Sequence, residues 1–241
     1  MDEGAPAEYN RGMSDPSSLL ERGLSALGFE DSAPIIEKLL KYLAEIETWN
    51  PAYGLVNASG DELVVKHILD SLAPWKILSA LLNEFDERSA SGPASVSDLG
   101  TGAGLPGIPL SIVMPGRKFR LVERMGKRIS FLESQRLILS LDNVEIVESE
   151  AERAPGPLDV VVFRAFRPFA ELKLFKSVWK CLSPGGAFLA YKGKALNARM
   201  ELAALAADPV LSGPAAHAEV EEVRVPFLDE ERCAVVLRKP S

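Results

Sequence analysis

The sequence predicts an α/β fold in which helices cover a mostly parallel β-sheet. A helical subdomain precedes this sheet and an antiparallel hairpin follows it. Three observations lead to this prediction. Apolar residues recur at helical spacing as far as residue 90, strand-like and helix-like runs then alternate up to residue 206, and two β-prone runs end the chain.

The composition is that of a soluble globular protein, with 241 residues, 47% hydrophobic and 25% charged. No apolar run approaches the roughly 20 residues that span a bilayer, and the acidic first ten residues do not resemble a signal peptide. We therefore expect a cytoplasmic protein with no membrane partner. The net charge of −7 argues mildly against broad coating of nucleic acid, but it leaves room for a local basic patch.

Cysteine and histidine are scarce, with two residues of each. Cys181 and Cys233 have no metal-binding spacing and form no disulfide framework. With only His67 and His217 beside them, we expect no metal site. Nothing in the composition demands more than a monomer.

The first 90 residues predict a helical subdomain, and residues 91–241 a second domain built on the sheet. Residues 1–14 are polar and expected to be mobile. Capping residues at 14–18 and 32–34 predict helix starts, the second of these helices ending at Asn50-Pro51. Asp61 is predicted to cap a third helix, and a fourth is expected from Pro74 to about Phe85.

The sheet domain is predicted from runs of alternating type. We expect strands near 94–99, 118–123, 143–148, 158–163 and 186–192, and helices near 105–114, 126–140, 168–181 and 194–206. Leu182-Ser-Pro-Gly-Gly186 is interpreted as a turn before the fifth strand. The runs 218–225 and 232–238 predict the terminal hairpin, and the three tryptophans are assigned to packing between helices.

A glycine-rich connection, Val96 to Leu110, follows the first strand. Its acid-x-Gly-x-Gly-x-Gly pattern is formed by Asp98, Gly100, Gly102 and Gly104. A dinucleotide fingerprint would need glycine where Leu105 stands, and a phosphate-binding P-loop would need lysine after its last glycine. The remaining pattern is similar to the first motif of class I S-adenosylmethionine-dependent methyltransferases, which have a Rossmann-like fold. The alternative is a tight strand-to-helix connection without a ligand.

Acidic residues follow the next two strands. Glu123 ends the second strand 23 positions after Gly100, the spacing at which an acid binds ribose hydroxyls in nucleotide folds. After the third strand, Ala151 and Glu152 lie where backbone groups could contact an adenine edge. Ordinary solvated surface carboxylates are the alternative at these positions.

The end of the predicted fourth strand limits which kind of atom can accept a methyl group. It reads Phe163-Arg-Ala-Phe-Arg-Pro168, without the Asn/Asp-Pro-Pro-aromatic motif that typically holds an exocyclic amine. Neither cysteine lies in the Pro-Cys setting typical of carbon-5 methylation. The acceptor is therefore expected to be an atom that is already nucleophilic, such as a ring nitrogen with a free lone pair.

Several separate motifs together resemble one family. They are His67-Ile-Leu-Asp-Ser71 behind a basic residue, Leu99 to Pro109, Gly126-Lys-Arg128, Arg164-Ala-Phe166 and Lys192-Gly193, with Trp49-Asn50 and Tyr53 before them. In this order they resemble the RsmG (GidB) family, from about residue 35 to the C-terminus. These are bacterial 16S ribosomal RNA methyltransferases. The resemblance implies transfer from S-adenosylmethionine to N7 of a guanine in the 530 loop of the decoding region, at conventional position 527, in the small ribosomal subunit.

The resemblance also implies particular site residues. Cofactor contacts are expected at Gly100, Leu105, Ala151, Glu152 and Arg164, and the general fold adds Asp98, Gly102, Gly104 and Glu123. Two departures are modest, since Glu123 replaces a more usual aspartate and Lys66 stands where arginine is common. Guanine N7 carries no proton, so no general base is expected and alignment supplies the catalysis.

Arg164 is the residue expected to position the reactants, through a cofactor carboxylate, a phosphate or the guanine carbonyl. A strand-end structural salt bridge is its alternative role. RNA capture is assigned to a basic cluster with an adjoining histidine: Lys66, His67, Arg124, Lys127, Arg128, Lys192 and Lys194. His67, Phe166 and Phe169 are open cases, because each can either contact the guanine or pack inside the protein.

Two other functions stay open on the sequence alone. A methyltransferase with a small-molecule or protein acceptor fits the negative net charge, and a non-catalytic ribosome-assembly factor could retain the fold for RNA binding. The second is disfavoured by the complete glycine motif with Glu123 and Arg164. The sequence does not distinguish naked RNA, an assembly intermediate and the whole subunit as substrates.

Overall fold

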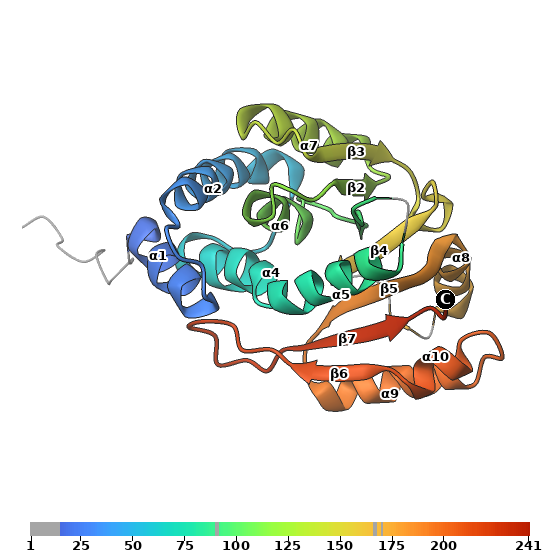
Figure 1. The fold of residues 1–241 in the computed structure, drawn as a ribbon. Helices are drawn as coiled ribbons and strands as arrows, with labels where there is room; N and C mark the ends of the chain where they lie inside the picture. Colours follow the sequence, from blue (N-terminus) through green and yellow to red (C-terminus); the bar gives the residue numbers. More distant parts are fainter. Residues whose placement is uncertain (1–14, 90–91, 166–167, 170) are drawn as a thin grey trace, which may run out of the picture.

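The computed structural model describes residues 15–89, 92–165, 168–169 and 171–241 (Figure 1). Its centre is a seven-stranded sheet with the order β3-β2-β1-β4-β5-β7-β6. The strands are β1 Val96–Leu99, β2 Phe119–Glu123, β3 Val144–Glu148, β4 Leu158–Arg164, β5 Leu182–Lys192, β6 Glu219–Glu222 and β7 Cys233–Arg238. The five parallel strands expected from the sequence are confirmed.

The terminal hairpin closes the sheet as expected. β7 runs antiparallel to β5, with Leu189 opposite Val236, and β6 then pairs antiparallel with β7. The last strand of the chain is therefore inserted between β5 and β6, and among the described strands it is the one whose direction is opposite to that of all the others. The predicted α/β class is confirmed.

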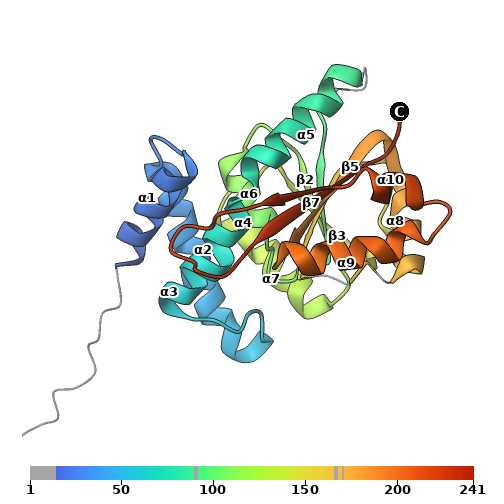
Figure 2. The same cartoon turned by 90° about the horizontal axis from the view of Figure 1, so that it is seen from below.

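Helices cover both faces of the sheet (Figures 1 and 2). One face carries α1 Pro16–Leu27, α2 Ala33–Tyr53, α3 Gly60–Leu63, the π-helix η1 Val64–Leu69, α4 Asp70–Leu72, α5 Trp75–Arg88, α6 Gly107–Val113 and α7 Gly126–Ile138. The other face carries the 3-10 turn η2 Ala151–Arg153, α8 Leu172–Cys181, α9 Ala195–Ala206 and α10 Ser212–Ala216.

Side chains point alternately to the two faces of the sheet along each strand, and this produces two hydrophobic clusters, one on each face. On β4, Val160 and Val162 belong to the cluster under the N-terminal helices, whereas Val161 and Phe163 face α8 and α9. The helices of residues 16–88 share the first cluster with the sheet, so they pack directly on it. The division at residues 90 and 91 stays a prediction, and residues 1–14 lie outside the described residues.

Most predicted boundaries hold, but α2 extends beyond its expected end. It continues through Pro51 to Tyr53 and is capped by Gly54 at φ 58°. Pro51 lacks the one hydrogen bond of its own N–H, and only two helical residues follow it, so its effect is confined to the last turn and the helix is not stopped at Asn50-Pro51. Asp61 is likewise not the cap of the third helix, because Ser59 precedes the first turn and Asp61 lies within it.

The expected turn at 182–186 is instead the first part of β5. The pairing register shifts there: between the pairs Leu158–Leu182 and Val160–Ala187, β5 contains three more residues than β4, and Gly185 has φ 76°. The strand takes up these residues in a bulge, which explains why Pro and Gly resembled a turn signal. The tryptophans pack as expected, Trp179 being buried and Trp49 and Trp75 partly buried against the first cluster.

Gly186 in this bulge gives a test of the sheet geometry. A Cβ at this position would lie 2.7 Å from the carbonyl oxygen of Asp159 and 2.9 Å from that of Ser183, and neither is free to move. We expect Gly186→Ala to lower the free energy of unfolding by about 1–3 kcal/mol in urea titrations. Gly116→Ala is the control, since a Cβ there has no heavy atom within 4 Å. Equal stability of the two variants would contradict the bulge.

Candidate functional site

The loop between β1 and α6 is shaped by three glycines with positive φ: Gly100 at 69°, Gly102 at 63° and Gly104 at 91°. Gly104 is required by packing, because a Cβ there would lie 2.4 Å from Ile108 Cδ1. Gly102 differs, since its nearest neighbours to an added Cβ are 3.9 Å away and include Arg128 Nη1. The loop therefore has open space at Gly102.

Asp98, near the end of β1, is buried under this loop and stabilises it by hydrogen bonds. Its Oδ2 accepts hydrogen bonds from Thr101 Oγ1 at 2.6 Å and from the Gly107 amide at 2.8 Å. Burial raises the pKa of Asp98 to about 6, against the opposing effect of these two hydrogen bonds. The side chain was predicted as a cofactor contact, but its described hydrogen bonds go to the loop and the start of α6.

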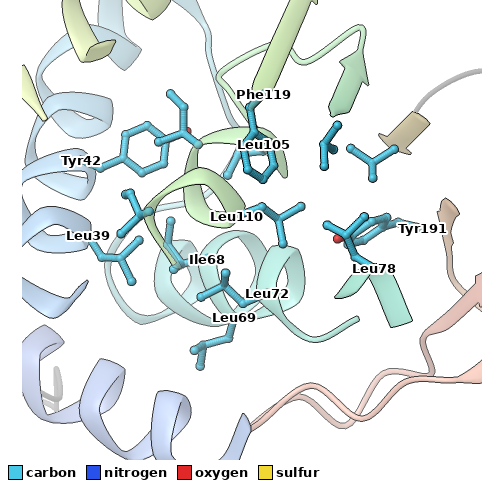
Figure 3. Close-up of a cluster of buried hydrophobic side chains, with 14 of the residues drawn as sticks. Leu39, Tyr42, Ile68, Leu69, Leu72, Leu78, Leu105, Leu110, Phe119 and Tyr191 are labelled. Carbon is cyan, nitrogen blue, oxygen red and sulfur yellow. The ribbon is translucent and has the colours of Figure 1, made fainter. Parts of the chain in front are cut away.

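Leu105 and Tyr42 hold the loop on the helical side (Figure 3). The Leu105 side chain is buried in the first hydrophobic cluster, so only its backbone remains for the predicted cofactor contact. The Tyr42 hydroxyl, from α2, donates a 2.5 Å hydrogen bond to the carbonyl oxygen of Ala103. The N-terminal helices thereby support the glycine loop directly.

A cleft of about 390 Å³ opens at the carboxyl ends of the parallel strands. It is lined after β1 by Gly100, at the end of β2 by Glu123, after β3 by Ala151 and Glu152, and after β4 by Ala165. The strand order reverses between β1 and β4, and ligands of open α/β sheets bind at such a switch point. The structure thus brings four of the predicted cofactor residues together.

Glu123 is the most engaged side chain of this cleft, with 4% of its surface exposed. Its Oε1 accepts hydrogen bonds from the amides of Arg124 at 2.8 Å and Met125 at 3.0 Å, and Oε2 accepts one from the Gly102 amide at 3.1 Å. Arg128 Nη1 lies 3.5 Å from Oε2. The carboxylate thus joins the first two strand ends, and its lone pairs suit ribose hydroxyl donors.

Arg164, at the end of β4, turns toward the π-helix. Its Nη1 donates to the carbonyl oxygen of Lys66 and to Asp70 Oδ2, both at 2.9 Å, and Nη2 lies 3.0 Å from His67 Nδ1. Its Nε is buried without a partner in the described part of the chain. The salt bridge that was the alternative role of Arg164 is present, and it fixes the guanidinium beside a second cleft.

Asp70 and Arg232 are functional candidates that the sequence did not predict. Asp70 Oδ1 accepts a hydrogen bond from Arg232 Nε at 2.9 Å, and Arg232 also pairs with Glu230. Asp70 lay within a motif that resembles the family, but its partners are 94 and 162 positions away. No local signal in the sequence indicates such pairs.

The second cleft has a volume of about 470 Å³ and adjoins the first at Ala165, which lines both. His67, Arg164, Tyr191 and Arg232 line it with other residues. Burial and the nearby Arg164 charge lower the pKa of His67 to about 4, so its ring is neutral at physiological pH.

The predicted RNA-binding residues separate into two groups. Arg124, Lys127 and Lys194 are exposed, and within the described residues their side chains have no ion pair, while Arg128 is partly buried over Glu123. Lys66 pairs with Glu62 and Glu230. Lys192 is 13% exposed, pairs with Glu201 at 2.6 Å and covers the Phe169 ring, so the structure does not bring it to the exposed group.

The two aromatic candidates have different outcomes. Phe169 is fully buried and packs edge-on against Phe163 and Phe175, which confirms core packing. Phe166 lies outside the described residues.

Among the described residues no set of three or more His, Cys, Asp or Glu is placed to hold a metal ion. The helices of this part of the chain include none that is long and apolar enough to cross a membrane.

Comparison with known proteins decides the family. The family model described as rRNA small subunit methyltransferase G matches residues 35–224. The chain belongs to this family. Ribosomal RNA small subunit methyltransferase G of Treponema denticola is 33% identical, covering 93% of this chain and 95% of that protein. Its counterpart from Xanthomonas euvesicatoria is 37% identical over 93% of this chain and 96% of its own length.

Solved structures confirm the fold. A SAM-dependent O-methyltransferase from Thermotoga maritima superposes with a TM-score of 0.53 at 15% identity, covering 83% of this chain and 71% of its own. A SAM dependent methyltransferase from Aquifex aeolicus gives 0.51 at 18% identity, over 81% and 97% of the two chains. The predicted class I methyltransferase fold and family are confirmed, and with them S-adenosylmethionine as the cofactor.

The residues of the first cleft fit this cofactor. Glu123 offers carboxylate oxygens to ribose hydroxyls, Gly102 leaves space for close approach, and the backbone at Ala151 and Glu152 lines the part of the cleft expected to hold adenine. Positive φ at Gly100, Gly102 and Gly104 turns the chain sharply beside this cleft, while the amides of Thr101, Gly102, Gly104 and Leu105 donate within the protein. Which of these groups bind it stays a prediction.

Glu123→Gln tests the assignment of the first cleft. The amide keeps the shape of the side chain but loses its charge and one acceptor oxygen. Hydrogen bonds to a charged group contribute about 1.5–3 kcal/mol, so we expect the Kd for S-adenosylmethionine to rise by roughly 10- to 100-fold in calorimetric titrations. Glu145→Gln on exposed β3 is the matched control. Unchanged affinity in a folded Glu123→Gln variant would remove this residue from the site.

Proposed function

We propose that this protein methylates N7 of a guanine in the 530 loop of 16S ribosomal RNA in the small ribosomal subunit. Membership of the rRNA small subunit methyltransferase G family carries the proposal, since it points to ribosomal RNA as the methyl acceptor. The position of the second cleft, which has room for a nucleobase and adjoins the first cleft, supports it. The reaction belongs to the cytoplasm, where bacterial ribosomes are assembled.

The arrangement of side chains suits an acceptor that needs no deprotonation. S-adenosylmethionine, when bound, supplies an electrophilic methyl group. Guanine N7 has an in-plane lone pair and no proton, so the protein has only to align and enclose the reactants. His67 is neutral and the Asp70 carboxylate is engaged by two arginines. These second-cleft groups therefore suit positioning rather than proton transfer.

Arg164 is proposed to position the reactants at the junction of the clefts. The ion pair with Asp70 and the Lys66 carbonyl hold its guanidinium, and its buried Nε lacks a partner in the described structure. A guanidinium held in this way orients neighbouring groups with little loss of side-chain entropy. We therefore propose that Arg164 acts by orienting the side chains that surround the methyl acceptor.

The exposed basic residues beside the clefts are proposed to bind RNA phosphates. Arg124 and Lys127 follow the end of β2, and Lys194 follows the end of β5, on the edge of the sheet where the cofactor cleft opens. Phosphate contacts position an RNA without reading its sequence. We call Arg124, Lys127 and Lys194 the basic rim; Lys66, Arg128 and Lys192 would join it only by leaving their carboxylate partners.

Identification of the modified nucleoside tests the proposed reaction. Small subunits and naked 16S RNA from a strain lacking this activity should accept labelled methyl groups, and nucleoside digestion with mass spectrometry should yield 7-methylguanosine. Nuclease mapping should place it in the 530 loop. Transfer to another nucleoside, or no transfer to either substrate by a protein that binds S-adenosylmethionine, would contradict the proposal.

Charge reversal tests the basic rim separately. In Arg124→Glu with Lys127→Glu, we expect RNA affinity to fall by about tenfold or more and the salt dependence of binding to become shallower, because phosphate contacts that release counterions are lost. The affinity for S-adenosylmethionine should change little. The matched control reverses Lys118 and Lys180, two exposed lysines at the opposite edge of the sheet. Equal effects of the two double variants would show that only net charge matters.

A further inference from the structure

His67 uses its two ring nitrogens differently. Nδ1 lies 3.0 Å from Arg164 Nη2, and the geometry makes this contact a hydrogen bond. An arginine guanidinium has only donors, so Nδ1 must be the acceptor. The imidazole is therefore held as the tautomer that carries its proton on Nε2.

The Nε2–H group points to a ligand. Within the described residues it has no hydrogen-bond partner, and it is not among the buried polar atoms that lack one. The ring is half-buried and lines the second cleft, so this donor faces accessible space there. A fixed donor without a partner, in a cleft with room for a nucleobase, is suited to an acceptor atom of the substrate.

We propose that His67 Nε2–H donates a hydrogen bond to O6 of the target guanine, and so selects guanine over adenine. The inference rests on the proposed function and names the residue that reads the base. Guanine presents N7 and O6 as adjacent acceptors on one edge, whereas adenine presents N7 and an amino donor. In this proposal N7 faces the first cleft and O6 lies in the second cleft, which adjoins the first at Ala165.

An adenine in the same position would place its amino group against the Nε2–H donor. Two donors cannot pair, and each would lose its hydrogen bond to water on burial. The tautomer cannot exchange to relieve this conflict, because Nδ1 is engaged by Arg164. Arg164 thereby fixes the tautomer of His67, and the fixed Nε2–H donor distinguishes guanine from adenine.

A neutral donor suits the chemistry at N7. As the N7 lone pair forms the bond to the methyl carbon, the bond from that carbon to sulfur breaks and its electron pair stays on sulfur. The base acquires the positive charge and no proton moves. A cationic donor at O6 would repel this charge, while neutral His67 avoids most of the repulsion. The nearby Arg164 charge is balanced by Asp70 at 2.9 Å.

The decisive experiment varies the acceptor atom and the histidine together. Small subunits are reconstituted with 16S RNA that carries guanine, inosine or 2,6-diaminopurine at the target position. Inosine keeps O6 and N7, whereas 2,6-diaminopurine keeps N7 and replaces O6 by an amino group. Initial rates give kcat/KM for each RNA with the unmodified protein, with His67→Phe and with the control His217→Phe, an exposed histidine at the end of α10.

We expect the unmodified protein and His217→Phe to methylate guanine and inosine RNAs comparably, and 2,6-diaminopurine RNA about 10- to 100-fold less efficiently, as one base-edge contact allows. His67→Phe should lose this preference to within about threefold. Its affinity for S-adenosylmethionine, measured by calorimetry, should match that of the unmodified protein.

Two outcomes would overturn the inference. One is a His67→Phe variant that still prefers guanine over 2,6-diaminopurine, and the other is an unmodified protein that accepts both equally. Failure of the unmodified protein to form 7-methylguanosine would instead defeat the proposed function, and the inference with it. Nitrogen NMR of labelled histidine gives a further check, since His67 must show a protonated Nε2 and an unprotonated Nδ1 at neutral pH.

Discussion

The shared Asp70 carboxylate connects three distant parts of the chain. One oxygen pairs with Arg164 at the end of β4, and the other pairs with Arg232 just before β7, both at 2.9 Å. Asp70 follows the π-helix, so these contacts fix the N-terminal helices, a central strand and the terminal hairpin in one arrangement. Removing one partner of a buried ion pair typically costs about 3–5 kcal/mol, because the remaining charge stays buried. The geometry of His67 depends on this carboxylate, since Asp70 holds the guanidinium that contacts the ring.

The first cleft, where we expect the cofactor, is shaped by buried carboxyl groups whose burial alone does not stabilise the fold. Asp98 is 1% exposed and its pKa is raised to about 6, so ionisation is disfavoured inside the protein. Such a residue is tolerated because it accepts hydrogen bonds from the Thr101 hydroxyl and the Gly107 amide, which an apolar side chain could not bind. Tyr42 fixes the same loop from the opposite side, through Ala103. The cleft is therefore preorganised by contacts outside it, and the N-terminal helices are part of its support.

The sequence predicted those features that depend on neighbouring residues. Strand and helix periodicity located all five parallel strands, and the glycine spacing with Glu123 indicated residues that the fold brings to one cleft. Three features depended on tertiary contacts and were not predictable in this way. The π-helix at Val64–Leu69 has an ordinary apolar helical pattern, yet its altered winding accompanies the hydrogen bond from Arg164 to the Lys66 carbonyl. Arg232 reaches Asp70 from 162 positions away. Lys192 resembled an exposed cation until the fold placed Glu201 and Phe169 around it.

A protein with a negative net charge can bind RNA when its unpaired basic side chains lie together. In this chain, ion pairs neutralise some basic side chains and leave others unpaired. Glu62 and Glu230 neutralise Lys66, and Glu201 neutralises Lys192, so basic side chains nearest the second cleft carry little uncompensated charge. The basic rim remains unpaired in the described structure, at the strand ends that flank the clefts. Under the proposed function, a phosphate backbone is attracted to the margin of the site, while the second cleft presents a neutral imidazole donor and an arginine paired with Asp70. In the proposed reaction, the attraction between the basic rim and the RNA phosphates does not oppose the cationic base that methylation forms, because the two act at different places.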